Sequence, residues 1–285
     1  MYAVTGASGP FGHLAIESLL ASGVAPENLV AIARTTAKAA DLEERGVVVR
    51  LGDYSDPTSL PGALEGVSTL LLVSGSEVGR RVAQHGAVVD AAAAAGVSRI
   101  VYTSAPHADT TRLVLAPEHK ATEELITASG LPYTFLRNSW YVENYTGQLP
   151  QYLAQGAIVS AAGAGRVSGA PRSDYAAAAA SALVGEGHEN AVYELGGPAF
   201  TMADLAAVVS EVSGTHVVSK QVSTAELVDI LRGAGLDEAT AGFVAALDEA
   251  TERGDLEVDP TVLEGLLGRP VTPLVDVVRA AYQGL

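Results

Sequence analysis

The sequence predicts an α/β fold in which helices cover both faces of a doubly wound parallel sheet, followed by a smaller α/β lobe. A short apolar strand runs into a glycine-rich turn and then into a helical pattern within residues 1–22. Apolar runs then alternate with helical patterns up to residue 137, as expected for parallel strands joined by right-handed crossovers. Beyond residue 137 the strands become shorter and helical segments dominate, which indicates a second structural unit.

The apolar runs of the first half predict six parallel strands. We expect them at residues 3–5, 29–33, 47–51, 67–73, 98–103 and 132–136. The fourth run is apolar almost throughout, which is typical of a strand buried on both faces. Helices are expected between the strands, at residues 11–22, 36–45, from 57 onward, 78–95 and 117–130.

The second half is expected to form a lobe that closes over the ligand edge of the sheet. Its helices are predicted at residues 141–155, 173–185 and 202–213, with further helices filling most of 223–283. Short strands are predicted at residues 157–161, 192–195 and 217–222. The strand at 192–195 is a candidate to rejoin the main sheet.

The composition limits the classes of function. The chain has 285 residues, 48% of them hydrophobic, which is enough for a large core. It has no cysteine, which excludes disulfides, thiolate zinc sites and a cysteine nucleophile and is compatible with a cytoplasmic location. A net charge of −16 opposes binding to nucleic acids and anionic lipids. We find no signal-peptide pattern and no apolar stretch of membrane-spanning length, and we expect no metal site.

Three glycines at regular spacing, Gly6, Gly9 and Gly12, follow the first strand. In a dinucleotide site, one glycine makes the tight turn, one admits the pyrophosphate and one lets the helix pack on the strand. The phosphates then meet the free N–H groups at the helix N-terminus. A plain glycine-rich turn is the alternative, but the position between a strand and a helix favours a dinucleotide. We therefore expect a Rossmann fold with a nucleotide-binding domain at 1–137 and a smaller substrate-binding lobe at 138–285.

The end of the second strand indicates which dinucleotide is bound. An acidic residue there accepts hydrogen bonds from the ribose of NAD, whereas an arginine suits the 2′-phosphate of NADP. Here the strand ends in Arg34, with Lys38 one turn further on and no acidic residue at that edge. This pattern favours NADPH over NADH, although Arg34 is also compatible with an ordinary surface arginine.

Two further strand ends point toward the same ligand. Asp53 follows the third strand and is a candidate to bond the adenine amino group, while the neighbouring Asp56 fits a helix-capping role better. Ser74, Gly75 and Ser76 follow the fourth strand, where small residues suit a backbone that passes beside a ribose or nicotinamide. A plain turn between strand and helix is the alternative for these three residues.

The candidate chemistry lies beyond the carboxyl ends of the later strands. His119 is in the first turn of a predicted helix and is a candidate proton donor, whereas Lys120 is better explained as a solvated surface lysine. Residues 137–145 hold the only tryptophan of the chain together with tyrosines and amides, which suits a planar ring or an anchor between lobes. No tyrosine has a lysine four residues later, which disfavours the Tyr-x-x-x-Lys mechanism of alcohol dehydrogenases.

These motifs together resemble the NmrA-like atypical short-chain reductases. The matching stretches extend over nearly the whole chain, at residues 4–12, 31–34, 70–78, 102–104, 107–109, 118–119, 136–145 and 174–179. Within this family the chain is most similar to bacterial NAD(P)H:quinone oxidoreductases of type 2, with triphenylmethane reductases as near relatives. The resemblance implies an NADPH-dependent reductase that acts on quinones without flavin.

The resemblance also implies roles for individual residues. The pyrophosphate would be held by Gly6, Ser8, Gly9, Pro10, Phe11 and Gly12, and the 2′-phosphate by Arg34. The ribose and nicotinamide would lie against Ser74, Gly75, Ser76, Asn138, Ser139, Trp140 and Tyr141. His119 occupies the helical turn where related reductases place a lysine, which leaves the proton donor open. The candidate catalytic residues are His119, Tyr141 and Asn138.

The leading hypothesis is direct hydride transfer from NADPH to a small-molecule quinone, which becomes aromatic on reduction and needs no strong general acid. A second hypothesis is a non-catalytic NADP(H)-binding redox sensor, because the catalytic pair is absent and NmrA-like proteins include such regulators. A third is a reductase of another conjugated compound, such as a triphenylmethane dye. We expect a monomer or homodimer.

Overall fold

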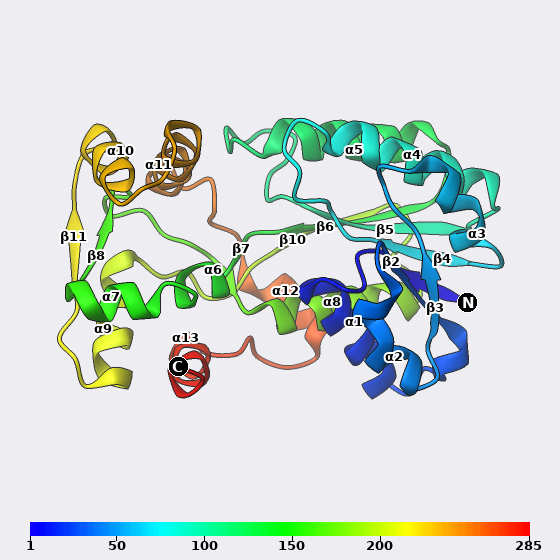
Figure 1. The fold of residues 1–285 in the computed structure, drawn as a ribbon, viewed down its shortest axis with the longest axis horizontal. Helices are drawn as coiled ribbons and strands as arrows, with labels where there is room; N and C mark the ends of the chain where they lie inside the picture. Colours follow the sequence, from blue (N-terminus) through cyan, green and yellow to red (C-terminus); the bar gives the residue numbers. More distant parts are fainter.

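A computed structural model describes residues 1–285. Its main sheet holds seven parallel strands in the order β10–β6–β5–β4–β1–β2–β3 (Figure 1). The strands are β1 (Tyr2–Val4), β2 (Leu29–Ala33), β3 (Val48–Leu51), β4 (Thr69–Leu72), β5 (Arg99–Ser104), β6 (Tyr133–Asn138) and β10 (Ala191–Leu195). This is the strand order of a doubly wound dinucleotide-binding sheet with one strand added at its edge. The predicted Rossmann fold is confirmed.

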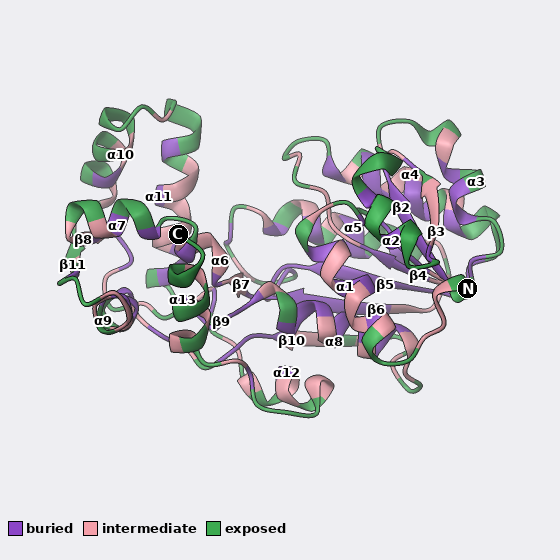
Figure 2. Ribbon diagram, turned by 60° about the horizontal axis from the view of Figure 1, so that its bottom comes forward, coloured by how far each residue is buried: buried purple, intermediate pink, exposed green.

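Helices cover both faces of the sheet because successive side chains of each strand point to opposite sides. In β2, Ala31 packs into one helical layer, whereas Val30 and Ile32 pack into the other. The first layer consists of α1 (Pro10–Ala21), α2 (Ala40–Glu44), α8 (Arg172–Val184) and α12 (Pro260–Leu267). The second layer consists of α3 (Leu60–Leu64), α4 (Arg81–Ala94) and α5 (Ala116–Ala128). Figure 2 shows the strands buried between outward helix surfaces that are exposed.

The second lobe, on the left of Figure 1, has its own apolar core, in which Val167, Phe200, Leu205 and Val278 are buried. It contains the parallel pair β8 (Ala157–Ser160) and β11 (Val218–Gln221). Its helices are α6 (Glu143–Thr146), α7 (Leu149–Gln155), α9 (Met202–Ser213), α10 (Thr224–Gly233), α11 (Glu238–Glu252) and α13 (Leu274–Gln283). None of the helices in the structure has both the length and the apolar character needed to cross a bilayer.

The chain passes back and forth between the two lobes. The strand expected at 192–195 does rejoin the main sheet, where β10 pairs in parallel with β6. The helices α8 and α12 also pack with the main sheet, although they follow residue 138 in the sequence. A division of the chain at residue 137 therefore assigns one strand and two helices of the nucleotide-binding unit to the second segment.

The prediction of one continuous helix over residues 141–155 is wrong. The chain first forms β7 (Trp140–Tyr141), which pairs with β9 (Gly169–Ala170), and then two separate helices, α6 and α7. Pro150 lies in the first turn of α7, where its missing N–H has no cost, whereas inside a longer helix it would remove a hydrogen bond.

Two smaller differences lie at loops. Residues 36–39 form a 3₁₀ turn, η2 (Thr36–Ala39), before α2, and the other 3₁₀ turns are η1 (Pro26–Asn28) and η3 (Pro57–Ser59). The helix predicted from residue 78 begins only at Arg81. Residues 73–80 are thereby left as an extended loop beyond β4, and this loop borders the site described next.

Candidate active site

A cavity of about 680 Å³ lies beyond the carboxyl ends of the main-sheet strands, where ligands of open α/β sheets bind. It extends from the turns after β1, β2 and β3 to the start of α5 and the segment after β6. All residues predicted for the cofactor or for catalysis line it: Gly6, Ser8, Gly9, Pro10, Phe11, Gly12, Arg34, Asp53, Ser74, Gly75, Ser76, His119, Asn138, Ser139, Trp140 and Tyr141. The fold thus brings together side chains that are more than a hundred positions apart in the sequence.

The glycine turn has the geometry that a pyrophosphate needs. Gly6 has a φ of +60°, a conformation that favours glycine, and a Cβ on Gly12 would overlap the carbonyl oxygen of Gly6. Gly9 is the N-cap of α1 and contributes no side-chain hydrogen bond, and Pro10 follows in the first turn. The first amides of α1 therefore have no partner within the helix and are available to an anion. The cradle fits the phosphates of a dinucleotide.

Two basic residues line the end of the cavity next to β2, Arg34 and Lys38. The side chain of Arg34 is 69% exposed, and its guanidinium lies 3.5 Å from the carboxylate of Glu77, which belongs to the loop after β4. Exposed ion pairs of this kind contribute little to stability, so a phosphate can displace the carboxylate at low cost. The position and charge of Arg34 and Lys38 fit the 2′-phosphate of NADP.

Asp53 lies in the turn after β3 and is partly engaged there. Its carboxylate accepts a hydrogen bond of 2.9 Å from the backbone N–H of Ser55, so part of its function is to hold that turn. Asp56 accepts from the N–H of Thr58 and is the N-cap of η3, as the sequence predicted. Asp53 also lines the cavity.

His119 is only 5% exposed and is neutral at ordinary pH. Burial lowers its pKa to about 3, and the nearby positive charge of Arg81 acts in the same direction. Its Nδ1 is hydrogen-bonded to the hydroxyl of buried Tyr102 at 2.8 Å. His119 can therefore serve as a hydrogen-bonding imidazole but not as a stored imidazolium acid. The neighbouring Lys120 is exposed and does not line the cavity, as predicted.

Asn138, the last residue of β6, presents an unsatisfied amide to the cavity. It is 5% exposed, and neither its side-chain oxygen nor its nitrogen has a partner in good hydrogen-bond geometry, although the amide lies close enough to the Tyr141 phenol to oppose the rise of the pKa of that phenol. Buried amides without partners are rare because the loss of their hydration costs free energy. The donor and acceptor of Asn138 fit the carboxamide of a nicotinamide ring or a carbonyl of the substrate.

Aromatic rings surround this amide. The Tyr141 ring centroid lies 6.1 Å from that of Phe11, and the Arg172 guanidinium carbon lies 5.0 Å from the Tyr141 centroid. Burial raises the pKa of Tyr141 to about 12, so its phenol stays protonated. Trp140 packs against the core of the second lobe, as expected for an anchor between lobes, and also lines the cavity, where binding of a planar ring stays a prediction. The result is an aromatic compartment that is bordered by the Arg172 guanidinium and contains the protonated phenol of Tyr141.

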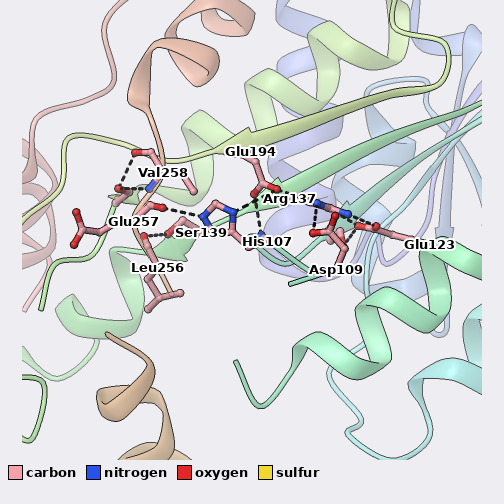
Figure 3. Close-up of polar contacts among 11 residues, drawn as sticks. His107, Asp109, Glu123, Arg137, Ser139, Glu194, Leu256, Glu257 and Val258 are labelled. Carbon is pink, nitrogen blue, oxygen red and sulfur yellow. Dashed lines mark hydrogen bonds and ion pairs between the residues drawn. The ribbon is translucent and has the colours of Figure 1, made fainter. Parts of the chain in front are cut away.

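A buried ion cluster fixes the backbone just before Asn138. Arg137 binds both carboxylate oxygens of Glu123, at 3.0 and 2.7 Å, and also contacts Asp109 and Glu194 (Figure 3). The hydroxyl of Ser139 donates a bond of 2.8 Å to the carbonyl of Leu256 in the second lobe. Arg137 therefore has a structural role. The hydroxyl of Ser139 joins the two lobes, and Ser139 also lines the cavity.

Several residues of this site have no clear signal in the sequence. Arg172 reaches the cavity from the start of α8, and Arg81 and Gln84 reach it from α4. Their positions depend on where these helices begin relative to the sheet. The only local hint was the small-residue stretch at 74–76, which precedes α4 by about one turn.

The fold and the site together define a dinucleotide-binding protein of the reductase class. Residues 6–186 match the family described as NAD(P)H-binding. The chain is 46% identical to "Quinone oxidoreductase 2" of Escherichia coli (strain K12), over 99% of both chains. It is 30% identical to the "NmrA-like family domain-containing oxidoreductase flvB" of Aspergillus flavus, over 98% of this chain and 94% of that one. This protein belongs to the NAD(P)H-binding, NmrA-like family of reductases.

Two solved structures agree with this assignment. The NADPH complex of the NADPH-dependent quinone oxidoreductase QOR2 from Escherichia coli superimposes with a TM-score of 0.95 at 45% identity, covering 99% of this chain and 100% of that one. The NADP(H) complex of the Citrobacter sp. triphenylmethane reductase gives a TM-score of 0.93 at 40% identity, with the same coverage of both chains.

Proposed function

We propose that this protein is an NADPH-dependent reductase that transfers hydride directly to quinones without a flavin. The observation that carries the proposal is the single cavity of about 680 Å³ that joins a dinucleotide cradle to an aromatic compartment. At one end it offers the glycine turn with Arg34, and at the other the unsatisfied amide of Asn138 beside Tyr141. The 46% identity to a quinone oxidoreductase over the full length supports the choice of quinone as acceptor.

Each part of the cavity then has a task. The amides of α1 bind the pyrophosphate, Arg34 and Lys38 bind the 2′-phosphate, and Asn138 orients the nicotinamide through its carboxamide. Bound NADPH supplies the hydride from this ring. Tyr141 and Trp140 present flat surfaces that align the quinone ring and exclude water from it. The protein contributes orientation more than acid–base chemistry.

The absence of a strong acid is consistent with a quinone acceptor. A quinone that gains a hydride becomes an aromatic hydroquinonate, and the proton that completes the hydroquinone can come from water. His119 and Tyr141 are both uncharged and can donate hydrogen bonds to the developing oxyanion. Neither has to give up its proton during hydride transfer.

Anaerobic turnover tests the proposal. Purified protein is mixed with NADPH and 1,4-benzoquinone, without added flavin, and the absorbance of NADPH is followed. Enzyme-dependent oxidation with one NADPH consumed per quinone supports direct transfer. Oxidation no faster than in the protein-free control contradicts it, and tight NADP(H) binding without any turnover would favour the redox-sensor hypothesis.

A triphenylmethane dye is the second candidate acceptor. The observation in its favour is the 40% identity to the Citrobacter sp. triphenylmethane reductase, with a TM-score of 0.93. Such a dye is also an electron-poor acceptor, a cation whose central carbon takes up hydride to give an uncharged leuco form. Decolourisation of a dye under the same anaerobic conditions, compared with benzoquinone by kcat/KM, ranks the two substrates.

We also propose that the protein is a monomer or homodimer and acts in the cytoplasm on a small molecule. Size-exclusion chromatography with light scattering measures the oligomeric state, and cell fractionation locates the protein. A larger assembly or a membrane-associated fraction would contradict this part of the proposal.

A further inference from the structure

Gly75 lines the cavity beyond β4, and its backbone N–H and its carbonyl are both hydrogen-bonded. Its N–H donates a hydrogen bond of 2.9 Å to Nε2 of His85, and its carbonyl accepts one of 2.8 Å from Nε of Arg81. Both partners lie on α4, and of the two only Arg81 lines the cavity. His85 is fully buried and does not itself line the cavity.

These contacts fix the protonation of His85. An N–H can only donate, so Nε2 carries no proton and the neutral ring has its proton on Nδ1. Nδ1 lies 3.0 Å from Oγ1 of Thr122, and this hydroxyl donates its own proton to the carbonyl of Glu118 at 2.8 Å. All donors in this chain of bonds therefore have acceptors. Burial, with the charge of Arg81, lowers the pKa of His85 to about 3, which agrees with a neutral ring.

The far end of this loop is held by α4 and α5. The N–H of Gly79 donates to Glu118 at 2.7 Å, and Glu118 forms a 2.6 Å ion pair with Arg81. At the near end, the N–H of Ser74 donates to Oγ1 of Thr103 at 2.8 Å. Hydrogen bonds thus hold the segment 74–79 at both ends. The acceptor for the N–H of Gly75, between these ends, is His85.

We propose that His85 is a positioning residue for the cofactor: it holds the Ser74–Ser76 segment as a rigid wall of the cavity by accepting the N–H of Gly75. The inference rests on the proposed use of this wall by NADPH. Without an acceptor at the position of Nε2, the Gly75 N–H is buried and unpaired, and the segment shifts to find a partner in the cavity. The space for the ribose and nicotinamide is then lost.

Two amide substitutions test the contributions of the two ring nitrogens of His85 separately. His85→Gln places an amide near the position of Nε2, where its oxygen can accept from Gly75. His85→Asn is the matched control, because its shorter side chain reaches only the position of Nδ1 and keeps the contact with Thr122. The dissociation constant of NADPH is measured by fluorescence titration, with kcat and KM for benzoquinone, and circular dichroism reports the melting temperature.

The proposal predicts that His85→Gln binds NADPH within about threefold of the wild type, whereas His85→Asn binds it about tenfold more weakly. The KM for quinone should change little in either variant. Equal losses in both variants, or a larger loss in His85→Gln, would overturn the proposal, because a packing or Thr122-related role predicts that order. If the wild-type protein binds NADPH but does not reduce quinone, the proposed quinone acceptor is wrong, and the role of His85 is still decided by the NADPH affinities of the two variants.

A measurement on the wild type covers the case in which neither variant folds. Nitrogen-15 labelling of histidine distinguishes the two neutral tautomers and the imidazolium by their long-range couplings. The proposal requires the His85 resonance to show a proton on Nδ1 and none on Nε2 between pH 5 and 8, with or without NADPH. A proton on Nε2 anywhere in this range overturns it.

Discussion

The two ends of the cavity differ in how they can recognise a ligand. At the end near β2, Arg34 is 69% exposed and its partner Glu77 is also in contact with solvent. At the end near β6, Asn138 and His119 are each 5% exposed and carry no charge. Charge in water acts over distance but weakly, whereas buried neutral donors act at short range and strongly. We infer that the exposed end selects the cofactor and the buried end positions the reacting rings.

Replacing Asn138 should have the largest effect. Asn138→Ala removes the unpaired amide from the buried end, and we expect kcat/KM for quinone to fall about a hundredfold, the cost of losing one aligned donor in a dry site. Asn144→Ala is the control, because the Asn144 side-chain oxygen already accepts a bond from Arg172. Steady-state kinetics check this; comparable losses in both variants would show that Asn138 has no special role.

Acid should destabilise the buried end. His85 and His119 have pKa values lowered to about 3 in the folded protein, while the unfolded chain titrates near 6.5. The unfolded state therefore binds more protons between these values, so the free energy of unfolding is highest above pH 6.5 and falls as the pH drops toward 3. The slope is about 1.4 kcal/mol per pH unit for each histidine.

Urea titrations at pH 7.5, 6.5 and 5.5 measure this effect. His85→Gln removes one of the two buried histidines, so its free energy of unfolding should fall less steeply with acid than that of the wild type. Parallel curves for the two proteins would mean that His85 titrates normally when folded.

Loss of Arg34 should have a smaller and more selective effect at the exposed end. Arg34→Ala removes the cation nearest the expected 2′-phosphate, and we expect NADPH binding to weaken about tenfold while NADH changes less than twofold. Arg80→Ala is the matched control, since Arg80 also pairs with Glu77 but does not line the cavity. Equal losses for the two cofactors would remove Arg34 from its assigned role.

Salt should give the smallest effect. Raising the ionic strength from 0.05 to 0.5 M screens exposed charges, so NADPH affinity should decrease by about threefold relative to NADH. The KM for benzoquinone should stay constant because this substrate carries no charge. A salt-dependent KM for benzoquinone would contradict the division between the two ends.

The parts of the site that the sequence predicts are those with a local physical signature. Gly6 and Gly12 are required by the backbone of one turn, and Arg34 follows directly from the end of one strand. The supporting residues have no such signature. His85 becomes meaningful only because α4 packs beside the loop after β4, and Arg172 because α8 returns to the sheet from the second lobe.

The same distinction explains the errors in the fold. Strands are visible as mainly apolar runs between turn residues, and all six of those predicted in the first half occur. The pairing of β7 with β9 joins two-residue segments nearly thirty positions apart, and neither segment is long enough to show a period. Contacts of that kind depend on the assembled tertiary structure.

The addition of β10 to the edge of the sheet has a consequence for biosynthesis. The nucleotide-binding sheet receives its last strand only after residue 195 has been made, and its helical cover is complete only with α12. A ribosome-bound chain of which only the glycine turn and the first six strands have emerged still exposes the β6 edge and the apolar surface that α8 covers. Such a nascent chain lacks cavity residues from Ser139 to Arg172, so we expect the complete cofactor site to form only after α8 has been made.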